Sequence, residues 1–188
     1  MSDQEFFTVH HQMNANVEPL GDGFSLPSKE QFEAEIPAPF IVASEFSQLD
    51  LINDQARAEL KNSDFKHVIQ LLDTQNSKLN LLLSFMLSQQ DDERFRCKTK
   101  SFGASQFTFA SEQAVSKGTH VRAKLFLEYP PAAIYCYGEV TDCQQEDSGH
   151  LVHVKYTLLR DSDQDLLIKA ALHQQQKLLR QRSLNRDS

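Results

Sequence analysis

The sequence predicts an α+β protein, in which a small antiparallel β-barrel with a C-terminal helix follows an N-terminal strand and two helices. Between Arg94 and Leu158, apolar and polar residues alternate in short runs about ten residues apart, which is typical of a sandwich or small barrel. Before them, residues 64–90 repeat with a helical period. After them, a segment that ends near Arg182 begins with acidic and ends with basic residues, as the helix dipole favours.

Composition narrows the classes of function. The chain has 188 residues, 40% of them hydrophobic, and a formal net charge of −7. Residues 1–60 carry 11 acidic and 2 basic side chains, and binding to phosphate backbones needs the opposite surplus. A nucleic-acid-binding barrel is therefore the least favoured alternative, and we expect no nucleic-acid partner.

We expect a soluble, cytoplasmic protein without membrane insertion. The most apolar run, "LNLLLSFML", is much shorter than the roughly 20 residues that span a bilayer. Asp3 and Glu5 stand where a signal peptide would be basic.

The sequence contains no pattern typical of an enzyme or a metal site. Cys97, Cys136 and Cys143 are odd in number and lack CxxC spacing, which indicates neither a disulfide framework nor a zinc site. His150 and His153 are three residues apart on an expected strand and so point to opposite faces. No GxSxG, P-loop, GxGxxG or HExxH motif occurs. We expect a non-enzymatic protein without metal or cofactor.

Two elements are expected near the N-terminus. From Phe7 to Val17 the odd positions are mostly apolar and the even positions mostly polar, which predicts one half-buried strand. Beyond the turn-rich "PLGDGFSLP", apolar residues spaced by three and four predict a helix from about Ser44, a candidate N-cap.

Residues 64–90 carry the strongest periodic signal, a heptad pattern of positions a and d. We name its members the heptad stripe: Phe65, Val68, Leu72, Gln75, Leu79, Leu82 and Met86. The stripe fits an ordinary amphipathic helix packed on its own domain, or a coiled coil that joins subunits. A Gln at a core position costs stability but selects register and strand number, which favours assembly. The helix is thus our candidate surface for homo-oligomers.

These elements suggest a division of the chain. Residues 1–91 form the N-terminal strand and helical region, residues 92–182 the barrel with its C-terminal helix, and residues 183–188 a tail. For the last helix, Ser162 is the predicted N-cap, followed by Asp165 three positions later.

The stretch "KTKSFGASQFTF" interrupts a strand pattern with small and polar residues. The interruption fits a β-bulge that bends a barrel strand, which we favour, or a place where the backbone approaches a ligand. Arg94, Arg96, Lys98 and Lys100 alternate along the same segment. Such a stripe attracts phosphate, although a solvated strand face is the commoner explanation.

The order of these elements resembles the PilZ domain, a small bacterial barrel with a C-terminal helix that binds cyclic di-GMP. The resemblance covers about Phe95 to Arg182 and rests on "VSKGTHVRAKLFLEYPPAAIYCYGEVTDC" and on the helix that begins after "RDSDQD". The helix with "SKLNLLLSFML" is similar to the one that precedes the barrel in atypical PilZ proteins, some of which assemble through it. The resemblance implies a non-enzymatic regulator of cyclic di-GMP signalling that acts through protein partners.

The family binds its ligand with an Arg-x-x-x-Arg loop and an [Asp/Asn]-x-Ser-x-x-Gly turn. Here Ser101, Gly103 and Gln106 stand at the three turn positions, and Arg94 and Arg96 are the only arginines near the barrel entrance. The loop is absent, and with it the arginines that clamp phosphates bidentately. The resemblance therefore implies weak or absent cyclic di-GMP binding that depends on Arg94 and Arg96. The alternative is an autonomous cyclic di-GMP receptor with an atypical site.

Overall fold

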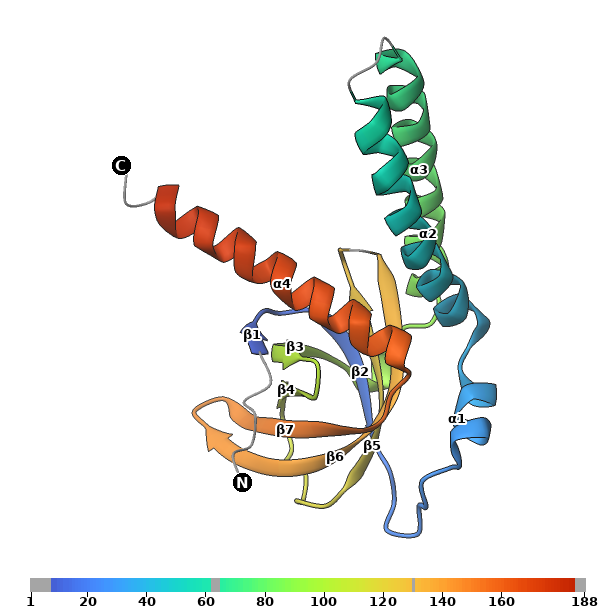
Figure 1. Cartoon of the computed structure of the whole chain (residues 1–188). Helices are drawn as coiled ribbons and strands as arrows, with labels where there is room; N and C mark the ends of the chain where they lie inside the picture. The colour runs from blue at the N-terminus through green and yellow to red at the C-terminus, as the bar shows by residue number, and fades with distance from the viewer. Residues whose placement is uncertain (1–7, 62–64, 130, 185–188) are drawn as a thin grey trace, which may run out of the picture.

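The computed structural model describes residues 8–61, 65–129 and 131–184, which form a β-barrel, a projecting helical arm and a long C-terminal helix (Figure 1). The predicted strand start at Phe7, the predicted helix start at Asp64 and tail residues 185–188 lie outside the described residues. The elements are β1 (Thr8–His10), β2 (Asn14–Pro19), α1 (Lys29–Glu35), α2 (Ala38–Leu60), α3 (Lys66–Ser88), the short 3-10 helix η1 (Glu93–Phe95), β3 (Arg96–Gly103), β4 (Gln106–Ser111), β5 (His120–Leu127), β6 (Ala132–Glu146), β7 (Gly149–Leu158) and α4 (Asp161–Leu184).

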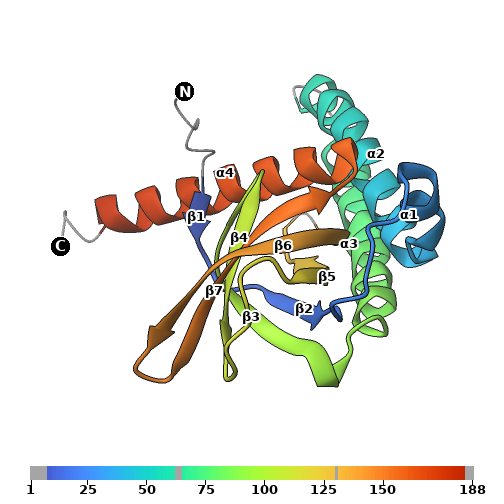
Figure 2. The same ribbon diagram turned by 90° about the horizontal axis from the view of Figure 1, so that it is seen from below.

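All strands belong to one antiparallel sheet, which confirms the predicted α+β barrel. Its order is β1-β3-β2-β5-β6-β7-β4, and an additional β3–β4 pairing closes the strands into a barrel (Figure 2). Closure leaves few free strand edges. The barrel core consists of alternating inward side chains, among them Leu125, Ile134 and Val154, all fully buried.

The predicted N-terminal strand is two strands, β1 and β2, separated by residues 11–13. Both pair with the same edge of β3, β1 near Gly103 and β2 near Lys98. At the break, the Met13 amide donates to the Thr99 hydroxyl at 3.0 Å, and that hydroxyl donates to the His11 carbonyl at 2.9 Å. The predicted alternation agrees with the observed burial, since the inward residues Val9, Met13, Ala15 and Val17 are buried. The sheet therefore contains strands from both sides of the predicted division at residue 91, β1 and β2 before it and β3 to β7 after it.

The interrupted segment is a hairpin rather than one bent strand. β3 ends at Gly103, and β4 begins at Gln106. The β3–β4 pairing also has a register shift, a bulge or other irregularity, between Thr99 and Ser101, before the stretch in which the bulge was expected. Small and polar residues suit turns and bulges equally, so the pattern alone did not separate the two. Gln164 of α4 donates to the carbonyl of Ala104 at 3.1 Å, which ties the turn to the C-terminal helix.

Within the described residues, three α-helices precede β3, one more than predicted. α1 begins with a capping box between Ser28 and Gln31, and only Phe32 in its seven residues is buried, so it lacks a periodic signature. α2 begins at Ala38, with proline in its first turn, where a missing N–H costs nothing. Ser44, the predicted N-cap, therefore lies inside α2 and is buried.

Helices α2 and α3 form an antiparallel pair, the arm, which projects from the barrel (Figure 1). An ion pair between Arg57 and Asp73 joins the two helices. Leu83 and Leu87, at the barrel end of α3, are buried. The apolar members of the heptad stripe are 43% to 62% exposed, and Gln75 is exposed too. Packing within the described chain thus leaves about half of the surface of these apolar side chains in solvent.

Helix α4 packs its first half over the barrel and begins at Asp161, so Ser162 lies within the helix and is not its N-cap. Leu166, Leu167, Ala170 and Ala171 form its buried face. Asp163 is 0% exposed and accepts two hydrogen bonds of 2.8 Å from the Arg160 guanidinium. Burial raises the pKa of the Asp163 carboxyl, and the bonds from Arg160 act in the opposite direction.

Replacing Arg160 with alanine is expected to destabilise the fold by about 3–5 kcal/mol, because it leaves a buried carboxylate unpaired. Urea unfolding at neutral pH measures this loss. The difference from wild type should narrow as the pH falls, because protonation neutralises Asp163 and removes the cost of leaving it unpaired. The variant gains more from this protonation, since it lacks the Arg160 bonds that oppose the rise in the pKa of Asp163.

The matched control is Lys169→Ala on the exposed side of the same helix, which should change stability by less than about 0.5 kcal/mol. If Arg160→Ala costs no more than this control, the ion pair does not hold α4 as described.

Candidate functional site

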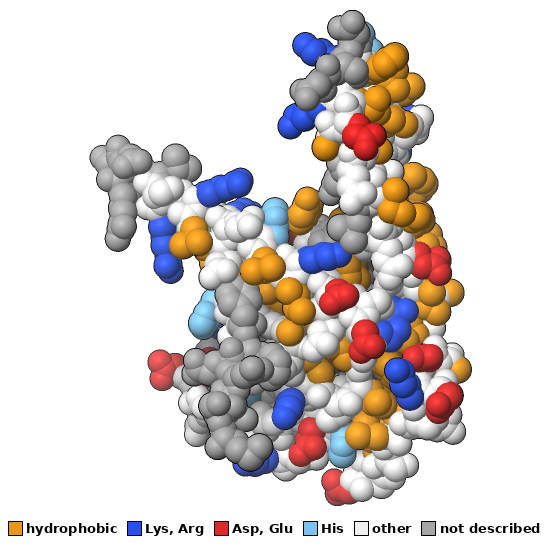
Figure 3. Space-filling view, in the orientation of Figure 1, with side chains coloured by type: hydrophobic (Ala, Val, Ile, Leu, Met, Phe, Trp, Pro, Cys, Tyr) orange, Lys and Arg blue, Asp and Glu red, His pale blue; other side chains and the backbone are white. Residues whose placement is uncertain are grey.

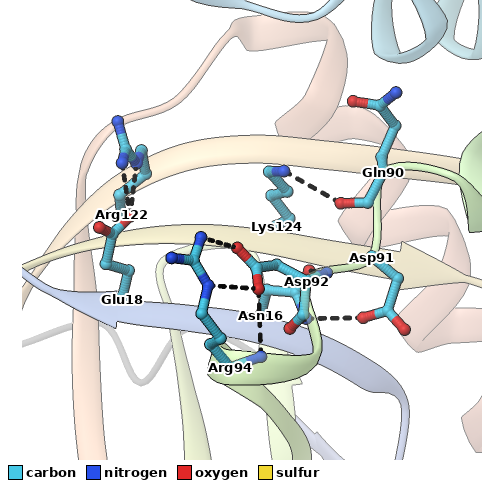
Figure 4. Close-up of polar contacts among 8 residues, drawn as sticks. All are labelled: Asn16, Glu18, Gln90, Asp91, Asp92, Arg94, Arg122 and Lys124. Carbon is cyan, nitrogen blue, oxygen red and sulfur yellow. Dashed lines mark hydrogen bonds and ion pairs between the residues drawn. The ribbon is translucent and has the colours of Figure 1, made fainter.

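The main polar cluster lies where the chain returns from the arm into the barrel (Figure 4). β2 contributes Asn16 and Glu18, and β5 contributes Arg122 and Lys124, at alternate positions of each strand. The connection from α3 through η1 contributes residues 90–94. Strand alternation places each pair on one face of its strand.

Asn16 is buried and fastens this connection to β2. Its amide nitrogen donates to the Asp91 carboxylate at 2.7 Å and to the Asp92 carbonyl at 3.1 Å. Its amide oxygen accepts from the Asp92 N–H at 2.8 Å. Since buried polar groups need such partners, Asn16 fixes both acidic residues in place.

Arg94 and Arg96 are both paired with acidic neighbours. The Arg94 guanidinium donates to the Asp92 carboxylate at 3.0 and 2.7 Å, and the Arg96 Nε donates to the Asp91 carboxylate at 2.8 Å. The hydrogen bonds from Arg94 lower the pKa of Asp92 to about 2. For Asp91, burial works against ionisation, but hydrogen bonds from Arg96 and Asn16 outweigh it and lower the pKa.

A pocket of about 260 Å³ lies beside this cluster. Arg122 donates to Glu18 at 2.9 Å, and the Lys124 ammonium donates to the Gln90 carbonyl at 3.0 Å. Burial disfavours the charge of Arg122, yet the Glu18 contact raises its pKa. Three cationic and three acidic side chains line the pocket, so its formal charge is balanced: Arg94, Arg122, Lys124, Glu18, Glu35 and Asp92.

The structure divides the predicted ligand-binding residues between the two ends of β3. Arg94 and Arg96 lie at its start, whereas Gly103 lies at its end, about 23 Å away along a strand of this length. The Ser101 hydroxyl is hydrogen-bonded to Thr108 at 2.8 Å. Gly103 is buried beside β1, and Gln106 is exposed at the start of β4. These five residues do not line one cavity.

Sequence reasoning missed Asn16, Glu18, Arg122 and Lys124. The alternation in "VRAKLFL" shows that Arg122 and Lys124 share a strand face, but nothing local shows what they meet. Asn16 lies 75 positions from Asp91, and Glu18 lies 104 positions from Arg122. Only the pairing of β2 with β3 and β5 brings them together.

Residues 8–61, 65–129 and 131–184 contain neither a metal site nor a helix that could span a membrane. No group of three or more His, Cys, Asp or Glu side chains there is arranged to hold a metal ion. No helix in the same ranges has the length and apolar character needed to cross a membrane.

Comparison with known proteins identifies the fold. No family model and no curated protein matches the sequence. The structure is similar to that of a pathogenic protein from Xanthomonas campestris, a tetrameric PilZ domain self-assembled via a helical bundle, with 15% identity, a TM-score of 0.56, and coverage of 94% of this chain and 91% of that chain. The Bacillus subtilis inhibitor of motility (MotI/DgrA) aligns with 44% of this chain and 42% of its own, at 16% identity and a TM-score of 0.40. The first similarity shows a PilZ-like fold.

Replacing Arg94 with alanine is expected to raise the pKa of Asp92 from about 2 toward the ordinary aspartate value near 4, because the side-chain hydrogen bonds are lost. A carbon-detected NMR titration of the carboxyl groups measures the shift. Lys98→Ala removes an equal charge from the exposed face of β3 and should leave Asp92 unchanged. An Asp92 pKa that stays near 2 in Arg94→Ala would contradict the described pairing.

Proposed function

We propose that this chain, which has a PilZ-like fold, is a non-enzymatic regulator in cyclic di-GMP signalling. It self-associates through its arm and acts through contacts with other proteins. Its own binding of cyclic di-GMP is weak or absent. The observation that carries this proposal is the exposed heptad stripe on α3.

The exposed apolar side chains of the arm support self-association. Its apolar surface exceeds the heptad stripe, since Leu71, Leu81 and Phe85 on α3 are 60% to 71% exposed as well. Figure 3 shows hydrophobic side chains gathered along the outer face of the arm. Isolated helices are marginal in water, and extended apolar patches on soluble proteins usually mark interaction sites. A coiled-coil or bundle contact would bury the stripe.

The similarity to the Xanthomonas protein supports the same proposal. That protein is described as a tetrameric PilZ domain self-assembled via a helical bundle, and the alignment covers 94% of this chain. Self-assembly through helices is therefore compatible with this fold.

Contacts in the barrel support the proposal that cyclic di-GMP binding is weak or absent. Arg94 and Arg96 would have to leave Asp92 and Asp91 before they could clamp a phosphate. The predicted turn residues lie at the far end of β3, and the turn between β3 and β4 is tied to α4. A ligand would thus have to displace existing charge-assisted bonds, which are stronger than neutral ones.

The alternative, an autonomous receptor with an atypical site, would use the pocket lined by Arg94, Arg122 and Lys124. Its volume and its three cations favour an anionic ligand. The three carboxylates in the same lining cancel that charge, which makes this the second candidate.

The double variant Leu72→Asp, Leu79→Asp should lower the mass of the oligomer, because it places charges within the heptad stripe. Light scattering at micromolar concentration measures the mass. The matched control is Gln70→Asp, Ser77→Asp, which adds the same charge at the same spacing on the same helix but outside the stripe. A monomeric wild type, or equal loss of mass in both variants, would refute association through the stripe.

Calorimetry with cyclic di-GMP should show weak or no binding to the wild-type chain. Loss of one bidentate arginine clamp typically removes about 2 kcal/mol, which weakens affinity more than tenfold. Any residual affinity should disappear in Arg94→Ala, Arg96→Ala and persist in the control Lys98→Ala, Lys100→Ala.

Two outcomes of this titration would count against the proposal. Tight binding to the wild-type chain that is lost in Lys124→Ala would favour the atypical receptor site. Tight binding that survives all of these changes would locate the ligand elsewhere.

A further inference from the structure

Helix α4 has a second uncovered apolar face. Its first half packs on β1, β3 and α2, whereas its second half extends beyond the barrel (Figures 1 and 2). Away from the packed side, Ile168, Leu172 and Leu179 are 40% to 56% exposed. Figure 3 shows hydrophobic side chains along α4 on the viewed face.

These residues belong to one stripe with alternating steps of three and four. We name it the α4 stripe: Asp165, Ile168, Leu172, Gln175, Leu179 and Arg182. All six are exposed. Residues with this spacing share one face of a helix, in the positions a and d of a heptad.

The α4 stripe is self-complementary when it is read in opposite directions. Two antiparallel copies, aligned about the midpoint between residues 173 and 174, place Ile168 opposite Leu179 and Leu172 opposite Gln175. The same alignment places Asp165 opposite Arg182. Every layer then joins an a position to a d position, and the charged layers close both ends of the apolar ones.

The charges of α4 favour this direction over a parallel one. Its first turns hold Asp161, Asp163 and Asp165, and from residue 166 to residue 183 its charged side chains are Lys169, Lys177, Arg180 and Arg182, all basic. A parallel pair would set like charges beside each other. An antiparallel pair sets the acidic start of each helix beside the basic end of the other and opposes the two helix dipoles.

We propose that α4 joins two copies of this chain through an antiparallel α4–α4 contact with the layers named above. The contact is isologous, so each copy offers the same surface. It does not depend on the arm, which leaves the barrel in a different direction (Figure 1). A chain that used both surfaces would have two separate interfaces, and therefore could link more than two copies.

Disulfide trapping in the full-length chain tests the register. An equimolar mixture of the variants Ile168→Cys and Leu179→Cys should form a covalent dimer on mild oxidation, because the two positions face each other. Each variant alone should give no more dimer than the native chain, whose Cys97, Cys136 and Cys143 are buried or half-buried. Two copies of one position would lie about 16 Å apart along the axis, beyond disulfide reach.

Two results of the disulfide trapping would overturn the proposal. Dimer from either single variant would indicate a parallel contact and overturn the proposal. No dimer in the mixture above the native background would show that α4 does not pair in this way, whatever else binds it.

Charge reversal gives an independent measurement in the arm variant Leu72→Asp, Leu79→Asp. There, Asp165→Arg or Arg182→Asp alone should abolish the remaining dimer, because each sets like charges in both end layers. A mixture of the two should restore it, since both end layers then hold opposite charges. Failure of the mixture to restore association would contradict the proposed pairing, while the result for the arm itself stays separate.

Discussion

Strand β3 has partners on both edges, and the rest of the structure depends on this pairing. Strands β1 and β2 occupy one edge, and β4 occupies the other, which closes the barrel. Asn16 of β2 lies directly opposite Arg96 of β3, so the chain leaves and re-enters the sheet at neighbouring points. The chain between β2 and β3 must therefore leave the sheet and return to it at a fixed place. An antiparallel helix pair meets this condition, because it carries the chain out and back.

The same constraint explains why the arm projects from the barrel and why the polar cluster forms at its base. Among the described residues of the arm, the buried apolar ones lie near its base, namely Phe40 and Ala43 of α2 and Leu83 and Leu87 of α3, and the heptad stripe extends beyond them. At the point of return, Asn16 holds Asp91 and Asp92, and these in turn engage Arg96 and Arg94. Cations that a ligand-binding barrel would offer to phosphate here serve to stabilise the junction. The proposals of self-association and of weak nucleotide binding thus rest on the same strand pairing.

Much of the fold follows from periodicity, which is local. Alternation located the barrel strands, and the heptad pattern located α3 to within a few residues. Errors arose where one pattern has two structural meanings. Small residues around Gly103 suited a bulge as well as a hairpin turn, and the short helix α1 has only Phe32 as a buried apolar residue. The polar cluster could not be predicted from the sequence, because Glu18 and Arg122 meet only through the pairing of β2 with β5.

The central claim is that the heptad stripe is buried between copies of this chain. Amide hydrogen exchange of the wild-type chain at two protein concentrations tests it most directly, since exchange reports local protection along each element. The account predicts that amides of α3 (Lys66–Ser88) lose protection on dilution, while amides of the barrel strands β5 and β6 keep theirs. Protection of α3 that is the same at both concentrations, in a protein that remains monomeric, would contradict it.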